Sequence, residues 1–390
     1  MFYIVIAMAT MLPFSYVVSS LLLVAGWGVF AYKSFKGFFE WKRTILDFPI
    51  MIFVIISFLS VLVSPDSAFS FYNCYNLVGR YVLTYYLVVQ SIDLKNIGQL
   101  KVFLSCISLS LFIVVIYGFM QAFLGIGLTS EQIVWTDGAM FPGLKTRVFS
   151  TWQNPNLLGG YFDLMLGLMA GMFLLIKHKI VRIVIAVLFC LTAFCLTLTY
   201  ARGACLSIAL VIFVYSILYN RKVLLALIGL AVILLLSDAT LVDRMTSIFT
   251  KMDTSSEMRL AFWESTIAMI LDHPLLGIGW GSYFMVYPNY YMQGNFIKIV
   301  HAHNMYLNFM AEIGLFGFAS YMVCFFGVIY KAFKAQVMKL DILVKAMFLG
   351  IGLGLSALAL NGFTDYVMFN TELSMLVWLF SGIVVSGYKN

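Results

Sequence analysis

Charged side chains are scarce in this sequence: only 11% of its 390 residues are Asp, Glu, Lys or Arg, whereas 63% are hydrophobic. Several apolar runs approach or exceed the ~20 residues that a helix needs to cross a bilayer. These runs are continuous rather than alternating, which excludes a transmembrane barrel. The composition therefore predicts an all-α integral membrane protein.

Several chemical signatures are also missing. The six cysteines show no paired spacing and lie in or beside apolar segments, so we expect them to pack rather than to form disulfides or bind metal. No Asp-x-Asp, Glu-x-Asp or His-Glu-x-x-His motif occurs, which argues against a divalent metal clamp. The glycines of LLGIGWGSYF follow no strand and do not complete a dinucleotide fingerprint. We therefore expect neither a metal nor a cofactor.

The apolar segments predict about twelve transmembrane helices. They cover approximately residues 2–12, 14–32, 48–63, 75–90, 99–123, 155–176, 180–199, 203–219, 223–236, 305–330, 342–360 and 368–386. Residues 1–32 alternatively form one broken helix, because only Pro13 separates the first two segments. The expected organisation is helices 1–9 in residues 1–236, a large helical loop in 237–304 and helices 10–12 in 305–390.

Basic residues orient these helices. With both termini in the cytoplasm, every inner connection carries Lys or Arg, as the positive-inside rule requires. The loop of residues 237–304 is then extracytoplasmic. Most of the net charge of +7 belongs to this signal and requires no nucleic-acid partner.

A minority of the basic residues falls on the outer side, against the rule. These are Arg80, Lys145, Arg147, Arg202, Arg244, Lys251, Arg259 and Lys298. Arginine forks suit phosphate oxygens, so several of these residues are candidates for binding an anion. Arg202, at the tip of the turn in LTLTYARGACLSIAL, is the sharpest case, although a snorkelling structural arginine is the alternative. Arg80 lies within an apolar segment and is costly there unless it is paired.

The large loop contains a predicted amphipathic helix. The stretch SEMRLAFWESTIAMILDH runs to Pro274, with Ser255 or Ser256 as N-cap and Arg259 in the first turn. One face is apolar, as in a helix that lies on the bilayer or on the helix bundle. That face consists of Leu260, Trp263, Ile267, Ile270 and Leu271.

The stretch VHAHNMYLNFMAEIGLFG brings His301 and His303 to the point where the loop re-enters an apolar run. Histidine titrates near neutrality, so it is the usual proton acceptor in catalysis. An interfacial position without function is the alternative, and a metal site lacks an obvious third ligand. If a helix has begun by His301, the two rings diverge by about 200° and only one can face an acceptor. Asn304 is then a candidate N-cap of the following helix.

The sequence resembles the O-antigen ligase and polymerase superfamily in five stretches between about Arg147 and Tyr388. They read FSTWQNPNLLGGY, LTYARGA, RLAFWESTIAMILDHPLLGIGWGSY, VHAHNMYLNFMAEIGLFGF and GFTDYVMF. The resemblance implies twelve transmembrane helices with a large extracytoplasmic loop between the ninth and tenth. It also implies metal-independent transfer of a glycan from a polyprenyl pyrophosphate to an acceptor hydroxyl outside the cytoplasmic membrane.

Three residues match the functional positions of that family. His303 falls on its catalytic histidine, whereas Arg202 and Arg259 fall on its two pyrophosphate-binding arginines. Supporting residues expected from position and chemistry are Arg147, Arg80, His301, Asn304 and Glu312. Asp365 stands at the outer end of the last connection, where an orienting role and a packing role are both open.

The expected reaction is an inverting transfer with His303 as general base, and His301 is expected not to be essential. We expect a repeat-unit polymerase, with transfer to lipid A core by a ligase and transport of an anionic or lipid-linked substrate as alternatives. The expected location is the bacterial inner membrane, with the active site on its extracytoplasmic side. Expected partners are the lipid-linked oligosaccharide donor, a glycan or lipid A core acceptor, the bilayer, a flippase and a chain-length regulator.

Overall fold

A computed structural model of the chain describes residues 1–38, 40–128, 146–219, 221–237, 239–250, 254–290 and 299–388. Throughout these residues the regular elements are helices, and seven are long and apolar enough to cross a membrane. The prediction of an all-α membrane protein is therefore confirmed. The helices divide into two compact units, which are interleaved along the chain.

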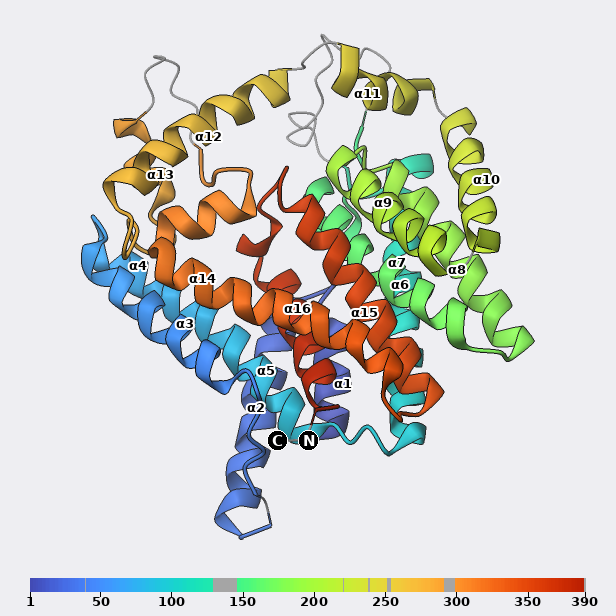
Figure 1. The fold of residues 1–390 in the computed structure, drawn as a ribbon, viewed down its shortest axis with the longest axis horizontal. Coiled ribbons are helices and arrows are strands. Elements are labelled where there is room, and N and C mark those ends of the chain that lie inside the picture. Colours follow the sequence, from blue (N-terminus) through green and yellow to red (C-terminus); the bar gives the residue numbers. More distant parts are fainter. Residues whose placement is uncertain are drawn as a thin grey trace. The chain divides into compact units, whose positions relative to one another are not determined.

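The first unit comprises residues 1–96, 258–331 and 362–390. Its helices are α1 (Phe2–Met11), α2 (Tyr16–Phe35), α3 (Asp47–Ser60), α4 (Ser67–Cys74), α5 (Arg80–Ser91), α12 (Thr254–Asp272, from Met258 onwards), α13 (Tyr283–Val286), α14 (Met305–Lys334, up to Lys331) and α16 (Thr371–Val385) (Figure 1). A π-helical turn, Tyr75–Gly79, joins α4 to α5. Helix α16 packs against α5, where the backbone of Tyr85 lies close to Gly382.

The second unit comprises residues 97–257 and 332–361. Its helices are α6 (Ile97–Leu124), α7 (Pro155–Leu175), α8 (Lys179–Thr197), α9 (Arg202–Tyr219), α10 (Arg221–Ser237), α11 (Ala239–Thr250) and α15 (Ile342–Asn361) (Figure 1). Asn154 caps α7 by accepting a hydrogen bond from Asn156 N at 2.8 Å, and Pro155 occupies the first helical position. This start coincides with that of the predicted apolar segment of residues 155–176.

Each of the twelve predicted apolar segments contains a helix, but the lengths differ. Residues 1–32 form two helices, since α1 ends at Met11 and Ser15 caps α2. Helix α1 has 10 residues and is about 15 Å long, roughly half of what a bilayer crossing requires. Helix α3 and helix α16 are also short. A helix is therefore present wherever an apolar segment predicts one, but not every helix spans a bilayer by its own length.

The amphipathic helix of the large loop is present as α12, with a different register. It begins at Thr254, so Ser255 and Ser256 lie inside its first turn and the predicted N-cap is wrong. The side chains packed on the interior are Phe262, Thr266 and Met269. Of the face predicted to be apolar and to lie on the bilayer or on the bundle, Leu260, Ile267 and Leu271 are exposed, whereas Trp263 and Ile270 are half-buried. Three of these five side chains are therefore exposed, whereas Trp263 packs against the buried cluster that contains Phe262 and Met269.

Hydrogen bonds join connections that the charge pattern assigns to the same side of the membrane. The Gln90 side chain donates to Lys42 O and accepts from Lys42 N, both at 2.9 Å, between two predicted inner connections. The hydroxyls of Ser64 and Ser282 are 2.7 Å apart, and both residues lie in predicted outer connections. The folding of the first unit is thus consistent with the predicted alternation of inner and outer loops.

Glycines set the distance between α7 and α15. A Cβ added to Gly167 would lie 2.2 Å from Gly354 N, and one added to Gly171 would lie 2.2 Å from Gly350 N. Each helix thus offers two small residues four positions apart, and the two backbones meet along these pairs. No side chain larger than hydrogen fits between these two backbones.

We therefore expect Gly171→Leu to destabilise the protein by about 3 kcal/mol or more, because the added side chain must displace a packed backbone. Thermal unfolding of the detergent-solubilised chain measures this loss. Gly229→Leu is the matched control, since nothing lies within 4 Å of its built Cβ. Equal unfolding temperatures for Gly171→Leu and Gly229→Leu would contradict the close α7–α15 contact.

Candidate active site

The start of α14 is held by Asn304. Its Oδ1 accepts hydrogen bonds from Tyr306 N at 3.0 Å and Leu307 N at 3.1 Å, so the N-cap predicted from the sequence is confirmed. Its Nδ2 donates to Phe363 O at 3.1 Å. One side chain thus caps α14 and ties it to the segment between α15 and α16.

That tie brings Asp365 to His303. The Asp365 Oδ1 lies 3.2 Å from His303 Nδ1 and also accepts a hydrogen bond from Tyr366 N at 2.8 Å. The Asp365 side chain is only 8% exposed, whereas that of His303 is 32% exposed. A buried carboxylate on Nδ1 favours the tautomer that carries its proton there, which leaves Nε2 as the acceptor.

His301 joins the same carboxylate. Its Nε2 is 3.9 Å from Asp365 Oδ1, and its ring centroid is 4.3 Å from that of His303. The ring stacks on Phe369, with centroids 4.8 Å apart. The expected divergence of the two imidazoles is not found, because α14 begins only at Met305 and His303 has a positive φ of 49°. Both imidazoles therefore converge on one oxygen.

The electrostatics of this group follow from its burial. Burial, and then the neighbouring His303 and Arg259, lower the pKa of His301 to about 3 despite the opposing carboxylate, so this ring is neutral. Burial alone would raise the pKa of Asp365. The hydrogen bond from His303 and the charges of His303, Arg259 and His301 outweigh it and hold that pKa below its usual range. Asp365 is consequently a carboxylate.

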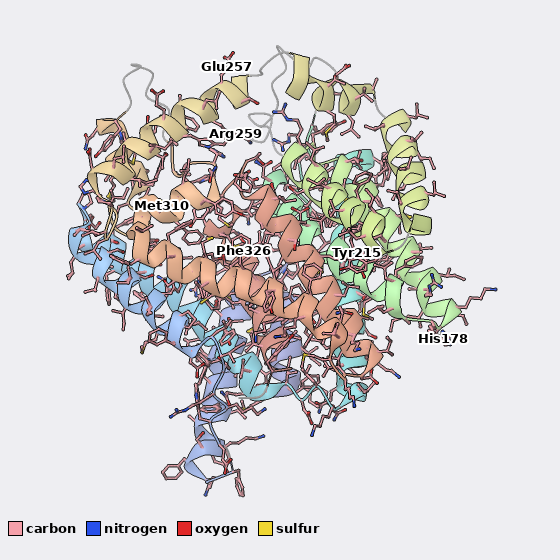
Figure 2. The ribbon with its side chains drawn as sticks, viewed as in Figure 1. His178, Tyr215, Glu257, Arg259, Met310 and Phe326 are labelled. Carbon is pink, nitrogen blue, oxygen red and sulfur yellow. The ribbon has the colours of Figure 1, made fainter. Side chains whose placement is uncertain are left out.

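Arg259 reaches this group from α12. On that helix Phe262 packs near His303, with ring centroids 5.9 Å apart, and Arg259 lies three residues earlier on an adjoining part of the same face. Figure 2 shows Arg259 and Glu257 leaving α12 on different sides. Arg259 is half-buried, and among the residues that the structure describes its guanidinium forms no ion pair. Its charge acts on both His301 and Asp365.

Helix α14, which follows the two histidines, is interrupted at Gly314. Gly314 has φ 64° and ψ −176°, which interrupts the helix. The carbonyls of Ala311 and Glu312 instead accept hydrogen bonds from Ile278 N at 2.9 Å and Gly279 N at 3.0 Å. A Cβ on Gly314 would lie 2.1 Å from Leu275 O. Of the glycines of LLGIGWGSYF, Gly277 packs closely on the backbone of α14, whereas Gly279 packs on Ser64 and Gly281 on Asn73.

Glu312 is buried on this broken helix and does not face the imidazoles. Its backbone carbonyl accepts the hydrogen bond from Gly279 N at 3.0 Å. Asn308 also accepts a hydrogen bond from Ala302 N at 3.0 Å, between the two histidines. Asn308 therefore ties the segment between the two histidines to α14, and the observed partner of His303 is Asp365.

Arg202 and Arg147 belong to the second unit. Arg202 is half-buried and is the first residue of α9, after a turn in which Tyr200 has a φ of 51°. Arg147 Nε donates to Thr199 O at 2.8 Å, and its Nη2 donates to Asn156 Oδ1 at 2.8 Å. The structure thus gives Arg147 a role in bracing the turn that presents Arg202.

Arg80 is placed in the first unit at the start of α5. Its guanidinium carbon lies 6.0 Å from the ring centroid of Tyr16, and its charge acts on Glu372. It is absent from the charges that act on Asp365. Lys145, Lys251 and Lys298 lie outside the described residues.

The three converging side chains also form a group capable of binding metal. One ligand atom each from His301, His303 and Asp365 lies within 4.8 Å of the others. The third ligand that the sequence did not reveal is therefore present. It is 62 positions from His303, and the only signal for it was an acidic residue in the outer connection within GFTDYVMF.

Two comparisons with known proteins bear on this site. Residues 185–322 match the model of a protein family described as O-antigen ligase. The matched stretch includes Arg202, Arg259, His301 and His303, whereas Asp365 lies beyond it. No curated protein matches the chain.

Proposed function

We propose that this membrane protein is a member of the O-antigen ligase and polymerase superfamily, because residues 185–322 match the O-antigen ligase family model, and that it catalyses a specific reaction. The enzyme transfers a glycan from a polyprenyl pyrophosphate to an acceptor hydroxyl on the extracytoplasmic face of the bacterial inner membrane. The acceptor is a second lipid-linked repeat unit, so the enzyme is a polymerase. Transfer to lipid A core is the alternative within the same chemistry.

The pair of His303 and Asp365 carries the proposal. The Nδ1–H of His303 donates to Asp365 Oδ1 across 3.2 Å, and Nε2 takes the proton of the acceptor hydroxyl. The freed oxygen attacks the anomeric carbon opposite the pyrophosphate, and the bond to the leaving group breaks with inversion. Asp365 stabilises the imidazolium that forms, and no metal is required for this step.

The arginines act on the leaving group. A departing pyrophosphate gains negative charge, which an arginine fork neutralises through paired hydrogen bonds. Arg259 is supported in this role by its position beside the histidines without an ion pair among the described residues, and Arg202 by its match to the family. Arg147 positions the turn before Arg202.

The purified full-length chain, supplied with a polyprenyl-pyrophosphate-linked oligosaccharide, tests this reaction. We expect elongated glycan and free polyprenyl pyrophosphate in equal amounts when the donor is the only acceptor. Product only after addition of lipid A core would identify the ligase. Movement of donor between vesicle leaflets without product would identify the transporter.

A second expected result concerns arginine geometry. Arg202→Lys and Arg259→Lys keep the charge but lose the fork, so each should lower turnover about 10-fold or more while the protein still inserts. Arg182→Lys is the control, because Arg182 lies in α8 over the ring of Phe173 at 4.7 Å and has no proposed role in the reaction. Wild-type turnover in both test variants would refute the leaving-group role.

The side of the membrane on which each connection lies can be measured by cysteine labelling. Glu257→Cys on α12 and Lys334→Cys at the end of α14 are both at exposed positions, in a chain whose six cysteines are replaced by alanine. A membrane-impermeant thiol reagent should label the first in intact cells and the second only after lysis, because the two connections are predicted on opposite sides. Labelling of Lys334→Cys in intact cells would place the histidines on the cytoplasmic side.

A further inference from the structure

The histidine and carboxylate group of the active site has a second capacity, which rests on the proposed function of His303. We propose that His301, His303 and Asp365 form an inhibitory binding site for a borderline divalent metal ion, of which Zn²⁺ is the type. Two imidazole nitrogens and one carboxylate oxygen are a donor set that Zn²⁺ prefers, with a fourth position left for water.

The spacing of the donor atoms fits this ion. Zinc bonds of about 2.0–2.1 Å at a tetrahedral angle place neighbouring ligand atoms about 3.3 Å apart. His303 Nδ1 and Asp365 Oδ1 are 3.2 Å apart, so their separation suits an ion bound to both once the imidazole turns its Nδ1 lone pair from the oxygen toward the ion. His301 Nε2 lies 3.9 Å from the same oxygen, and the three ligand atoms lie within 4.8 Å of one another, so the two nitrogens must approach each other by up to about 1.5 Å to complete the set.

The surroundings hold the ligands in place. Phe369 stacks on His301, Tyr366 N donates to Asp365, and Asn308 Oδ1 accepts from Ala302 N between the two histidines. Both His301 and Asp365 are about one-tenth exposed, whereas His303 is 32% exposed and provides the side from which an ion can approach. A preorganised group of this kind avoids part of the ordering cost of metal binding.

Occupancy would stop the reaction through the tautomer of His303. The coordinate bond forms at Nδ1, the Nδ1–H···Oδ1 hydrogen bond breaks, and that proton leaves to solvent. A neutral imidazole bound at Nδ1 carries its proton on Nε2, which it takes from solvent, so the ring keeps one proton. Nε2 then has no lone pair for the acceptor hydroxyl, and the base is lost.

The test uses the full-length, cysteine-free chain stripped with EDTA. Equilibrium dialysis should show one Zn²⁺ per chain, Co²⁺ should give a tetrahedral visible spectrum, and Mg²⁺ should not bind. His301→Ala and Asp365→Asn should each weaken Zn²⁺ binding roughly 100-fold or more, since loss of a direct ligand exceeds the effect of an outer-shell change. His178→Ala and His273→Ala, which alter the other two histidines, should bind Zn²⁺ like the parent.

Binding and activity are read separately. Zn²⁺ should abolish glycan transfer by the parent chain, and EDTA should restore it. The metal site would be overturned if the folded parent did not bind one Zn²⁺ per chain. It would also be overturned if His301→Ala, His301→Asn and Asp365→Asn all bound Zn²⁺ as tightly as the parent. Equilibrium dialysis needs no glycan substrate, so it tests the metal site alone. If the proposed reaction is wrong, the parent chain will be inactive in EDTA, and the result of the dialysis will be unaffected.

Discussion

Replacing His303 with alanine should abolish glycan transfer while lipid-linked donor accumulates in the membrane. Loss of a positioned general base typically costs ~10²–10⁴-fold in rate, and no other group in the described residues offers an exposed imidazole nitrogen held by a buried carboxylate. Membranes that contain equal amounts of each variant, incubated with labelled donor, provide the measurement.

The matched control for this result is His273→Ala. His273 lies just beyond the end of α12, is exposed and is remote in sequence from the HAHN motif. The His273→Ala variant should transfer glycan at the wild-type rate. That result would exclude a general effect of removing an imidazole from the outer loop. Full activity in His303→Ala would remove the proposed mechanism.

Asp365→Asn is expected to reduce turnover by about 10²-fold or more, with little change in the KM for donor. The substitution keeps the shape of the side chain but removes the charge that stabilises the imidazolium. An amide can also donate to Nδ1, which would place the proton of the neutral ring on Nε2 and block the base. Asp365 acts through His303 and not on substrate, so turnover rather than donor binding should respond.

Asp93→Asn serves as the control for this substitution. Asp93 lies in a predicted inner connection, where it accepts a hydrogen bond from Lys95 N at 3.0 Å. Its variant should behave like wild type. Equal loss in the two variants, or a rise in donor KM without a fall in turnover, would show that Asp365 does not orient the base.

Much of this fold could be predicted because a bilayer imposes simple constraints. Apolar length predicted a helix in each of the twelve segments, and Asn304 was recognised as a cap because Asn before an apolar run satisfies free backbone amides. The break at Gly314 could not be predicted, since a glycine inside an apolar run equally suits an unbroken helix. What stabilises the break is pairing with residues 274–279, which no local pattern reveals.

The candidate site likewise combines a residue that the sequence predicts with a partner that only the fold reveals. The chemistry of His303 was visible in the sequence, whereas the partner of His303 was not, because Asp365 and Glu312 are both acidic residues near the outer end of a helix. Only the hydrogen bond from Asn304 to Phe363, which fixes the last outer connection against α14, decides between them. The sequence left open whether the apolar face of α12 lies on the bilayer or on the bundle, because lipid and protein interiors both select apolar side chains.

In the proposed reaction His303 acts as a general base without a metal ion. The most direct test of this role compares wild-type and His303→Ala chains, purified in EDTA, for donor binding and for release of polyprenyl pyrophosphate in the presence of acceptor. We expect equal donor affinity in the two chains, release of polyprenyl pyrophosphate by the wild type and no release by the variant. Release at the wild-type rate by His303→Ala, or a wild type that is inactive in EDTA and restored by a metal ion, would contradict this role.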